Sequence, residues 1–119
     1  VLEKYPRLKF VLSHLGGTIP YISERIDRGY DAYPEVRKNI SHHPSYYFKR
    51  CYFDTVAFYP NALRFAIDYA GAERVLLGSD YPHQIGDMEK AVKVIEALPV
   101  DERTRRQELG QNAARLLKI

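Results

Sequence analysis

The stretch Arg74-Val75-Leu76-Leu77-Gly78-Ser79-Asp80 decides the fold class, because an unbroken apolar run ends there in a glycine and two polar residues. Two earlier stretches have the same form. Lys9-Phe10-Val11-Leu12 leads into Ser13-His14, and Cys51-Tyr52-Phe53 leads into Asp54-Thr55. None of the three runs alternates apolar with polar residues, which is typical of strands buried on both faces of a parallel sheet.

Helical patterns lie between and after these runs. Four are expected. The first lies in the middle of a mixed stretch from Ile19 to about Lys38, and the others span Asn61 to Ala70, Asp87 to Leu98, and Asp101 to about Lys118 with a break at Gly110. The clearest is the third, which Asp87 begins as an N-cap and whose apolar stripe comprises Met88, Ala91, Val92, Ile95 and Leu98. Residues 39–49 are expected to form a loop with at most one short turn. Strands alternating with helices predict an α/β fold with a parallel sheet.

Polar side chains follow each predicted strand at its carboxyl end. His14 follows the first strand, Asp54 the second and Asp80 the third. In α/β folds the loops at this end converge and form the active site, so we expect the three side chains to share one rim. A histidine and two carboxylates there are suited to binding a metal or exchanging protons.

Each of these residues also has a purely structural interpretation. A histidine after a strand is often a hydrogen-bonded structural residue, and Asp54 can equally be the N-cap of the next helix. Pro82 biases its predecessor toward an extended conformation, so Asp80 is a poor helix cap and a functional role is favoured for it. Gly16-Gly17 lacks the full pattern of a phosphate-binding loop.

The remaining candidates favour structural roles. Cys51 lies within a predicted strand and is expected in the core, where a thiol is unreactive. The neighbouring His42 and His43 are expected on the surface, because adjacent side chains rarely bind one metal together.

Length and composition exclude several classes of protein. The chain has 119 residues, enough for one domain, and is 45% hydrophobic and 28% charged, which excludes a disordered or collagen-like chain. The net charge is +3, but the basic residues are scattered, so we expect no nucleic-acid partner. No apolar run is long enough to cross a membrane, and with a single cysteine we expect a cytoplasmic protein.

Several stretches together resemble a known family. They are, in order, Phe10-Val11-Leu12-Ser13-His14-Leu15-Gly16-Gly17, Glu24-Arg25, Tyr52-Phe53-Asp54-Thr55, Leu76-Leu77-Gly78-Ser79-Asp80-Tyr81-Pro82-His83 and Gly110-Gln111-Asn112-Ala113-Ala114-Arg115-Leu116-Leu117. This ordered set resembles the amidohydrolase-related (amidohydrolase 2) family of metal-dependent hydrolases. Within the family it is most similar to the branch that includes aminocarboxymuconate-semialdehyde decarboxylase.

The resemblance implies a fold and a set of functional residues. The family fold is a (β/α)₈ TIM barrel with one divalent metal, commonly Zn²⁺, and the three strands would be its sixth, seventh and eighth. His14 would be a catalytic residue beside the metal-bound water, and Asp80 would be both a metal ligand and a catalytic residue that handles a proton. Arg25 would bind a substrate carboxylate, although a surface ion pair with Glu24 or Asp27 is an equal alternative.

This chain departs from the family pattern in what it lacks. The His-x-His pair of the first barrel strand and the histidine of the fifth have no counterpart, and 119 residues cannot close a barrel of about 200 residues or more. The chain starts at Val1, without methionine. We therefore expect residues 1–119 to be one partial barrel domain, the C-terminal part of a longer enzyme. Its open strand edges are expected to make it a homo-oligomer or to bind its missing N-terminal part.

The resulting functional prediction is a metal-dependent hydrolase that acts on a small molecule through a metal-activated water. The first alternative is a metal-dependent non-oxidative decarboxylase of a small carboxylic acid. The second is a non-catalytic partial barrel that serves only in assembly or binding.

Overall fold

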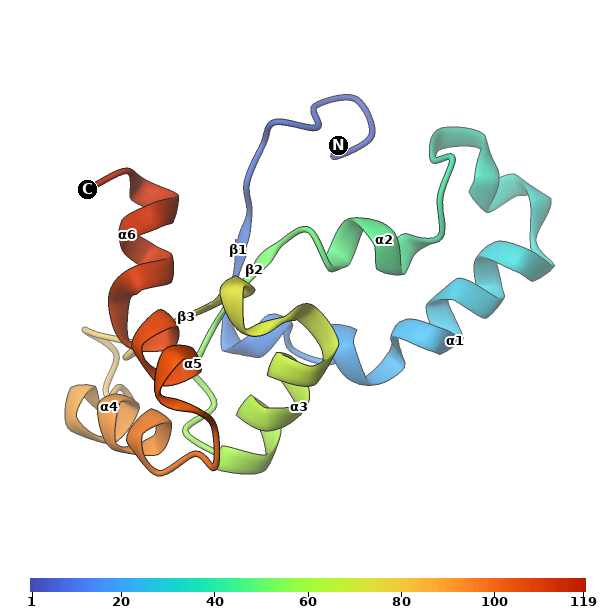
Figure 1. Cartoon of the computed structure of the whole chain (residues 1–119). Helices are drawn as coiled ribbons and strands as arrows, with labels where there is room; N and C mark the ends of the chain where they lie inside the picture. Colours follow the sequence, from blue (N-terminus) through green and yellow to red (C-terminus); the bar gives the residue numbers. More distant parts are fainter.

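The computed structural model describes all of residues 1–119 as an α/β fold built on a three-stranded parallel sheet. The strands are β1 (Val11–Leu12), β2 (Tyr52–Asp54) and β3 (Val75–Leu76), in the spatial order β1-β2-β3 (Figure 1). Both pairings are parallel, so the carboxyl ends of the three strands lie at one edge of the sheet. This confirms the predicted fold class and the position of all three strands.

The three strands differ in how deeply their side chains are buried. Phe53 in the central strand and Val75 in β3 are fully buried, as predicted for a covered sheet. Val11 in β1 is 49% exposed, so the prediction of two buried faces is wrong for this strand. The physical reason is that helices pack against β3 but not to a similar extent against β1, although both are edge strands.

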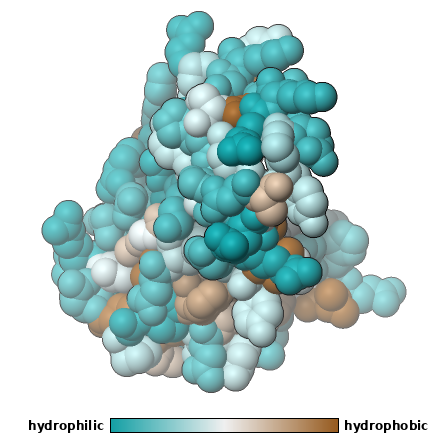
Figure 2. Space-filling view, turned by 90° about the vertical axis from the view of Figure 1, so that its right-hand side faces the viewer, coloured by the Kyte–Doolittle hydropathy of each residue, from teal (hydrophilic) through white to brown (hydrophobic).

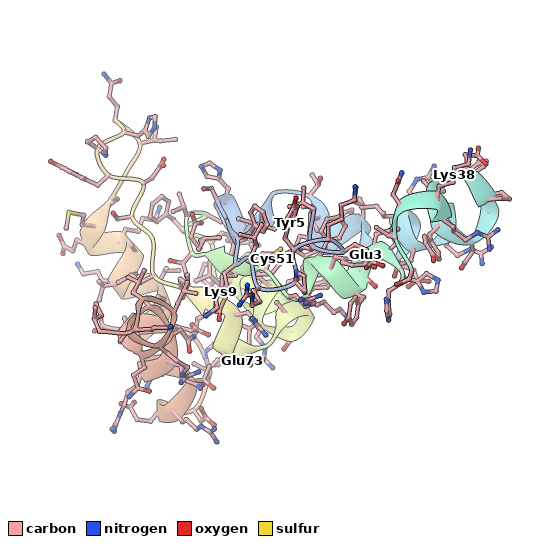
Figure 3. All side chains as sticks on the ribbon, turned by 90° about the horizontal axis from the view of Figure 1, so that it is seen from above. Glu3, Tyr5, Lys9, Lys38, Cys51 and Glu73 are labelled. Carbon is pink, nitrogen blue, oxygen red and sulfur yellow. The ribbon has the colours of Figure 1, made fainter.

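An arm of helices extends away from the sheet (Figure 1). It comprises α1 (Ile19–Ala32), the 3-10 helix η2 (Pro34–Asn39) and α2 (Pro44–Phe48). The helix expected within residues 19–38 is confirmed as α1, which ends at Ala32 because Pro34 disfavours the helical conformation in the residue before it. In Figure 3, Lys38 lies at the tip of this arm and Cys51 at its base. The short helix α2 lies within the segment predicted as a loop with at most one short turn.

The main core lies between the sheet, α3 (Pro60–Ala70) and α4 (Met88–Glu96). Its buried residues are Leu15, Leu63, Ala66, Val94, Ile95 and Leu98. Asp87 caps α4 as predicted, because its side chain accepts a 2.8 Å hydrogen bond from the N–H of Lys90. The predicted stripe is wrong at its first residue: Met88 is 65% exposed, and Val94 is buried instead.

The C-terminal segment is helical with the predicted break. It comprises α5 (Glu102–Arg106), the π-helical turn η4 (Gln107–Gln111) and α6 (Asn112–Leu117). The break falls at Gly110, whose φ of 177° is not helical. Buried Asn112 ties this segment to β3 and to the preceding 3-10 helix η3 (Ala72–Arg74), donating hydrogen bonds to the carbonyls of Ala72 (2.7 Å) and Val75 (2.8 Å).

The arm makes the molecule elongated, with extents of 46 × 31 × 29 Å. Seen from the arm's side, the surface is largely hydrophilic with scattered hydrophobic residues (Figure 2). None of the helices has both the length and the apolar character needed to cross a membrane.

Candidate functional site

The side chains of His14 and Asp80 meet at the carboxyl edge of the sheet. His14 opens the 3-10 helix η1 (His14–Gly16) after β1, and Asp80 lies in the loop after β3. The distance from Nε2 of His14 to Oδ1 of Asp80 is 4.0 Å. The imidazole is 62% exposed and the carboxylate 16%, so the histidine faces open space and the aspartate lies deeper. The structure thus brings these two predicted site residues together.

The backbone of both residues is strained. His14 has φ 55°, its neighbour Leu15 has φ 54° and Asp80 has φ 60°, all in the left-handed region. Such conformations cost a non-glycine residue about 1–3 kcal/mol each and are concentrated at functional sites. The surrounding contacts must therefore hold both loops in place.

Asp54 supplies one of these contacts and is not a helix cap. Its Oδ1 accepts hydrogen bonds from the backbone N–H of His14 (2.8 Å) and of Val56 (3.0 Å). The N-cap of α3 is Tyr59, so the N-cap alternative for Asp54 is wrong. The predicted position of Asp54 at the shared rim is confirmed. Its hydrogen bond to the backbone of His14 was not predicted, because the only indication in the sequence was that Asp54 follows the second apolar run.

Thr55 supplies the equivalent contact toward β3, and the sequence analysis missed it. Its hydroxyl accepts a 3.0 Å hydrogen bond from the N–H of Gly78 and donates to the carbonyl of the same residue at 3.3 Å. Gly78 must be a glycine, because a Cβ there would lie 2.9 Å from Cγ2 of Val56 and 3.0 Å from Cβ of Asp54. The loops after β2 and β3 are therefore in close contact.

A cavity of about 490 Å³ opens beside His14, between the beginnings of α1 and α3. It is lined by His14, Leu15, Gly17, Pro20, Tyr21, Ala57, Tyr59, Asn61, Ala62, Phe65 and Ala66. Most of these are apolar or aromatic, with the imidazole and the Asn61 amide as polar groups. Such a lining suits a small molecule with an apolar body and one or two polar groups.

Arg25 lies apart from these groups. It is exposed on α1, lines neither wall of the cavity beside His14, and forms no ion pair within the chain. The alternative of a surface ion pair with Glu24 or Asp27 is therefore wrong. Its predicted role in binding a substrate carboxylate stays a prediction.

The chain alone offers an incomplete donor set for a metal. No group of three His, Cys, Asp or Glu side chains is close enough together to hold an ion. Asp80 and His14 are ligand types that divalent metals accept, since carboxylate oxygens suit manganese and magnesium and imidazole suits zinc. With only two such residues, this chain would need further ligands from other residues to hold a metal ion.

The weaker candidates have structural roles. Cys51 is buried, and this burial raises the pKa of its thiol, which confirms the prediction of an unreactive core residue. His43 lies 2.8 Å from Asp31, and His42 stacks on Tyr46 with ring centroids 4.2 Å apart. Both histidines are exposed, as predicted.

Comparison with known proteins adds independent evidence. The family model described as amidohydrolase matches residues 1–119. Over 120 residues the chain is 29% identical to 2-amino-3-carboxymuconate-6-semialdehyde decarboxylase of Dictyostelium discoideum, covering 100% of this chain and 33% of that protein.

Solved structures give the same result. The 5-carboxyvanillate decarboxylase of Sphingomonas paucimobilis is 33% identical with a TM-score of 0.88, covering 99% of this chain and 36% of that one. A dihydroxybenzoic acid decarboxylase of Polaromonas sp. JS666, solved with manganese and 2-nitroresorcinol, is 30% identical with a TM-score of 0.86, covering 98% and 36%.

The chain thus spans about a third of the length of the relatives it matches. Those relatives are enzymes, and decarboxylases are prominent among them. Since the family model covers every residue, the chain belongs to the amidohydrolase family.

Proposed function

We propose that this chain is the C-terminal part of a metal-dependent decarboxylase that removes carbon dioxide from a small aromatic carboxylic acid without oxidation. The observation that carries the proposal is the 4.0 Å approach of His14 and Asp80 at the carboxyl ends of two parallel strands. The similarity to decarboxylases supports this reaction over the hydrolysis that the sequence analysis put first.

In this proposal the three strands are the sixth, seventh and eighth of a (β/α)₈ barrel. The support is the order of strands and helices, together with the open edges of β1 and β3. The other barrel strands would cover these edges and supply the remaining metal ligands. Residues 1–119 then form one incomplete barrel domain.

The chemistry assigns different tasks to the two residues. In decarboxylation the bond between the substrate carbon and its carboxylate breaks, the electron pair stays on that carbon, and a proton must be delivered to it. Asp80 would hold the divalent metal through its carboxylate and would move this proton. His14 faces the cavity, where its imidazole stabilises the negative charge that develops on the substrate. A bound divalent metal would polarise the substrate oxygens that it contacts.

The cavity beside His14 supports a substrate with an aromatic ring. Tyr21, Tyr59 and Phe65 line it, and aromatic walls favour stacked or edge-on contacts with another ring. Arg25 does not line this cavity, so it would bind the carboxylate only of a substrate that extends beyond the cavity along α1. Metal analysis after purification distinguishes Zn²⁺ from Mn²⁺.

The test measures the reaction directly in the full-length protein that contains this chain. Carbon dioxide release is followed with hydroxybenzoates and related aromatic acids, and ester and lactone hydrolysis is measured in parallel. Metal-dependent carbon dioxide release supports the proposal. Hydrolysis without carbon dioxide release would establish the hydrolase alternative instead. A protein that binds no divalent metal and turns over neither class of compound would be a non-catalytic barrel.

A further inference from the structure

We propose that the adjacent residues Asp54 and Thr55 form a positioning pair that sets the separation of His14 and Asp80. Asp54 ends the central strand β2 and Thr55 follows it, and each bonds to the loop after a different neighbouring strand. This inference rests on the proposed function for the tasks of His14 and Asp80.

Asp54 holds the loop after β1. Its Oδ1 accepts a 2.8 Å hydrogen bond from the N–H of His14, the first of two consecutive non-glycine residues with positive φ. A hydrogen bond from a backbone N–H to a carboxylate is stronger than one between neutral groups. The second bond, from the N–H of Val56 at 3.0 Å, fixes the carboxylate itself. The direction of the His14 side chain therefore depends on Asp54.

Thr55 holds the loop after β3. Its side chain is fully buried, and its hydroxyl bonds both the N–H and the carbonyl of Gly78. Because both bonds go to the same residue, they restrict the movement of its backbone. Breaking either one would leave a buried polar group without a hydrogen-bond partner, which is costly. Only Ser79 separates Gly78 from Asp80, so the position of Gly78 sets the start of the segment that presents the carboxylate.

The pair acts through the backbone. Asp54 bonds the N–H of His14, and the contact between His14 and Asp80 is made by other atoms, the imidazole Nε2 and the carboxylate Oδ1. We therefore regard Asp54 and Thr55 as positioning residues. A merely structural role would lower stability throughout the domain, whereas a positioning role alters the two loops selectively.

The experiment uses the full-length protein with four variants. Asp54→Ala and Thr55→Val remove the hydrogen bonds, and Asp54→Asn and Thr55→Ser keep an oxygen that can accept them. Amide hydrogen exchange at His14 and Gly78 is measured together with kcat and KM. Asp54→Ala should speed exchange at His14 about tenfold and leave Gly78 unchanged, and Thr55→Val should do the reverse. Both should lower kcat more than they raise KM, and the conservative variants should restore wild-type values.

The matched control is Asp101→Ala. Asp101 also accepts a backbone N–H, that of Thr104 at 2.7 Å, but it caps α5 away from the site. This variant should leave exchange at His14 and Gly78, and kcat, unchanged. If Asp54→Ala fails to fold, Thr55→Val with Thr55→Ser carries the same test on the β3 side.

The proposal is overturned if removing either side chain leaves exchange at its partner amide unchanged, or if the conservative variants fail to restore it. The exchange measurements need no turnover. A wild-type protein without decarboxylase activity would therefore overturn the proposed function, while exchange at His14 and Gly78 would still decide whether the pair positions the loops.

Discussion

Asp54 accepts a 2.8 Å hydrogen bond from the backbone N–H of His14. The last residue of the central strand β2 thus holds the backbone of the loop that follows the neighbouring strand β1. The bond joins loops that are far apart in the sequence, and it forms because the parallel register pairs Leu12 with Phe53, the residue before Asp54. The same parallel sheet brings Asp80 within 4.0 Å of the imidazole. Strand pairing therefore assembles the candidate site.

Replacing Asp80 and replacing His14 in the full-length protein are predicted to have different effects on metal content and turnover. Asp80→Ala should abolish both bound metal and turnover, because a carboxylate ligand is lost. His14→Ala should lower kcat by about 100-fold or more while retaining most of the metal. Metal content by mass spectrometry and kcat are measured on the same preparations. Near-normal turnover in His14→Ala would show that its catalytic role is wrong.

Glu108 is predicted to make stability depend on pH. Its side chain is fully buried and neither carboxylate oxygen has a hydrogen-bond partner, and this burial raises its pKa from 4.5 to about 7. The folded state thus keeps a proton that the unfolded chain releases above pH 4.5. The free energy of unfolding should therefore be highest below pH 4.5, fall by about 1.4 kcal/mol per pH unit between pH 4.5 and about pH 7, and be constant above that.

The control for this dependence is Glu108→Gln, which stays neutral at every pH. Denaturant unfolding between pH 5 and 7 should show a slope for the wild type and almost none for the variant. The pKa values of Glu3 and Asp101 are lowered by hydrogen bonds, from Tyr47 and Thr104 respectively, so these carboxylates reduce stability only in acid, outside this window. Equal slopes in the two proteins would contradict a buried neutral Glu108.

Leu63 is predicted to be essential to the core. It is fully buried in α3 among the main core residues, so Leu63→Ala should destabilise the fold by about 2–5 kcal/mol. Leu117→Ala is the matched control, because Leu117 is 65% exposed and should change stability by less than about 0.5 kcal/mol. Equal losses in thermal unfolding would mean that the core has been located incorrectly.

The open edge of β1 is predicted to drive association of the isolated chain. Val11 is 49% exposed on this edge strand, and unpaired strand edges pair with other chains. Size-exclusion chromatography should show concentration-dependent oligomers, and Val11→Lys should reduce them. Val36→Lys is the control: Val36 is equally exposed, at 48%, but lies in η2. A monomer at every concentration would refute the prediction.

The sequence predicted the parts of the fold that depend on local patterns. The cap at Asp87, the break at Gly110 and the three strand positions follow from residue type and spacing, and the structure confirms them. Met88 was misplaced because a helical stripe does not reveal how a helix is rotated against its neighbours. The exposure of Val11 was not predicted because an apolar run does not reveal which strands of a sheet the helices of the same chain cover.

The site was predictable in outline only. Because loops converge at the carboxyl ends of parallel strands, the sequence predicts His14, Asp54 and Asp80 at one edge of the sheet. The structure confirms this placement. The contact between Thr55 and Gly78 depends on strand register, which no local pattern encodes. The burial of Glu108 could not be predicted from the sequence, because a glutamate in a helix with charged neighbours is expected at the surface.

In the proposed function, His14 and Asp80 belong to the active site of a metal-dependent decarboxylase. The most direct measurement is carbon dioxide release from aromatic carboxylic acids by the full-length protein, before and after removal of the metal by a chelator and with Asp80→Asn. Release that stops without metal, returns when Mn²⁺ or Zn²⁺ is added, and is absent in the variant is the predicted result. Undiminished release by the Asp80→Asn protein would contradict the account.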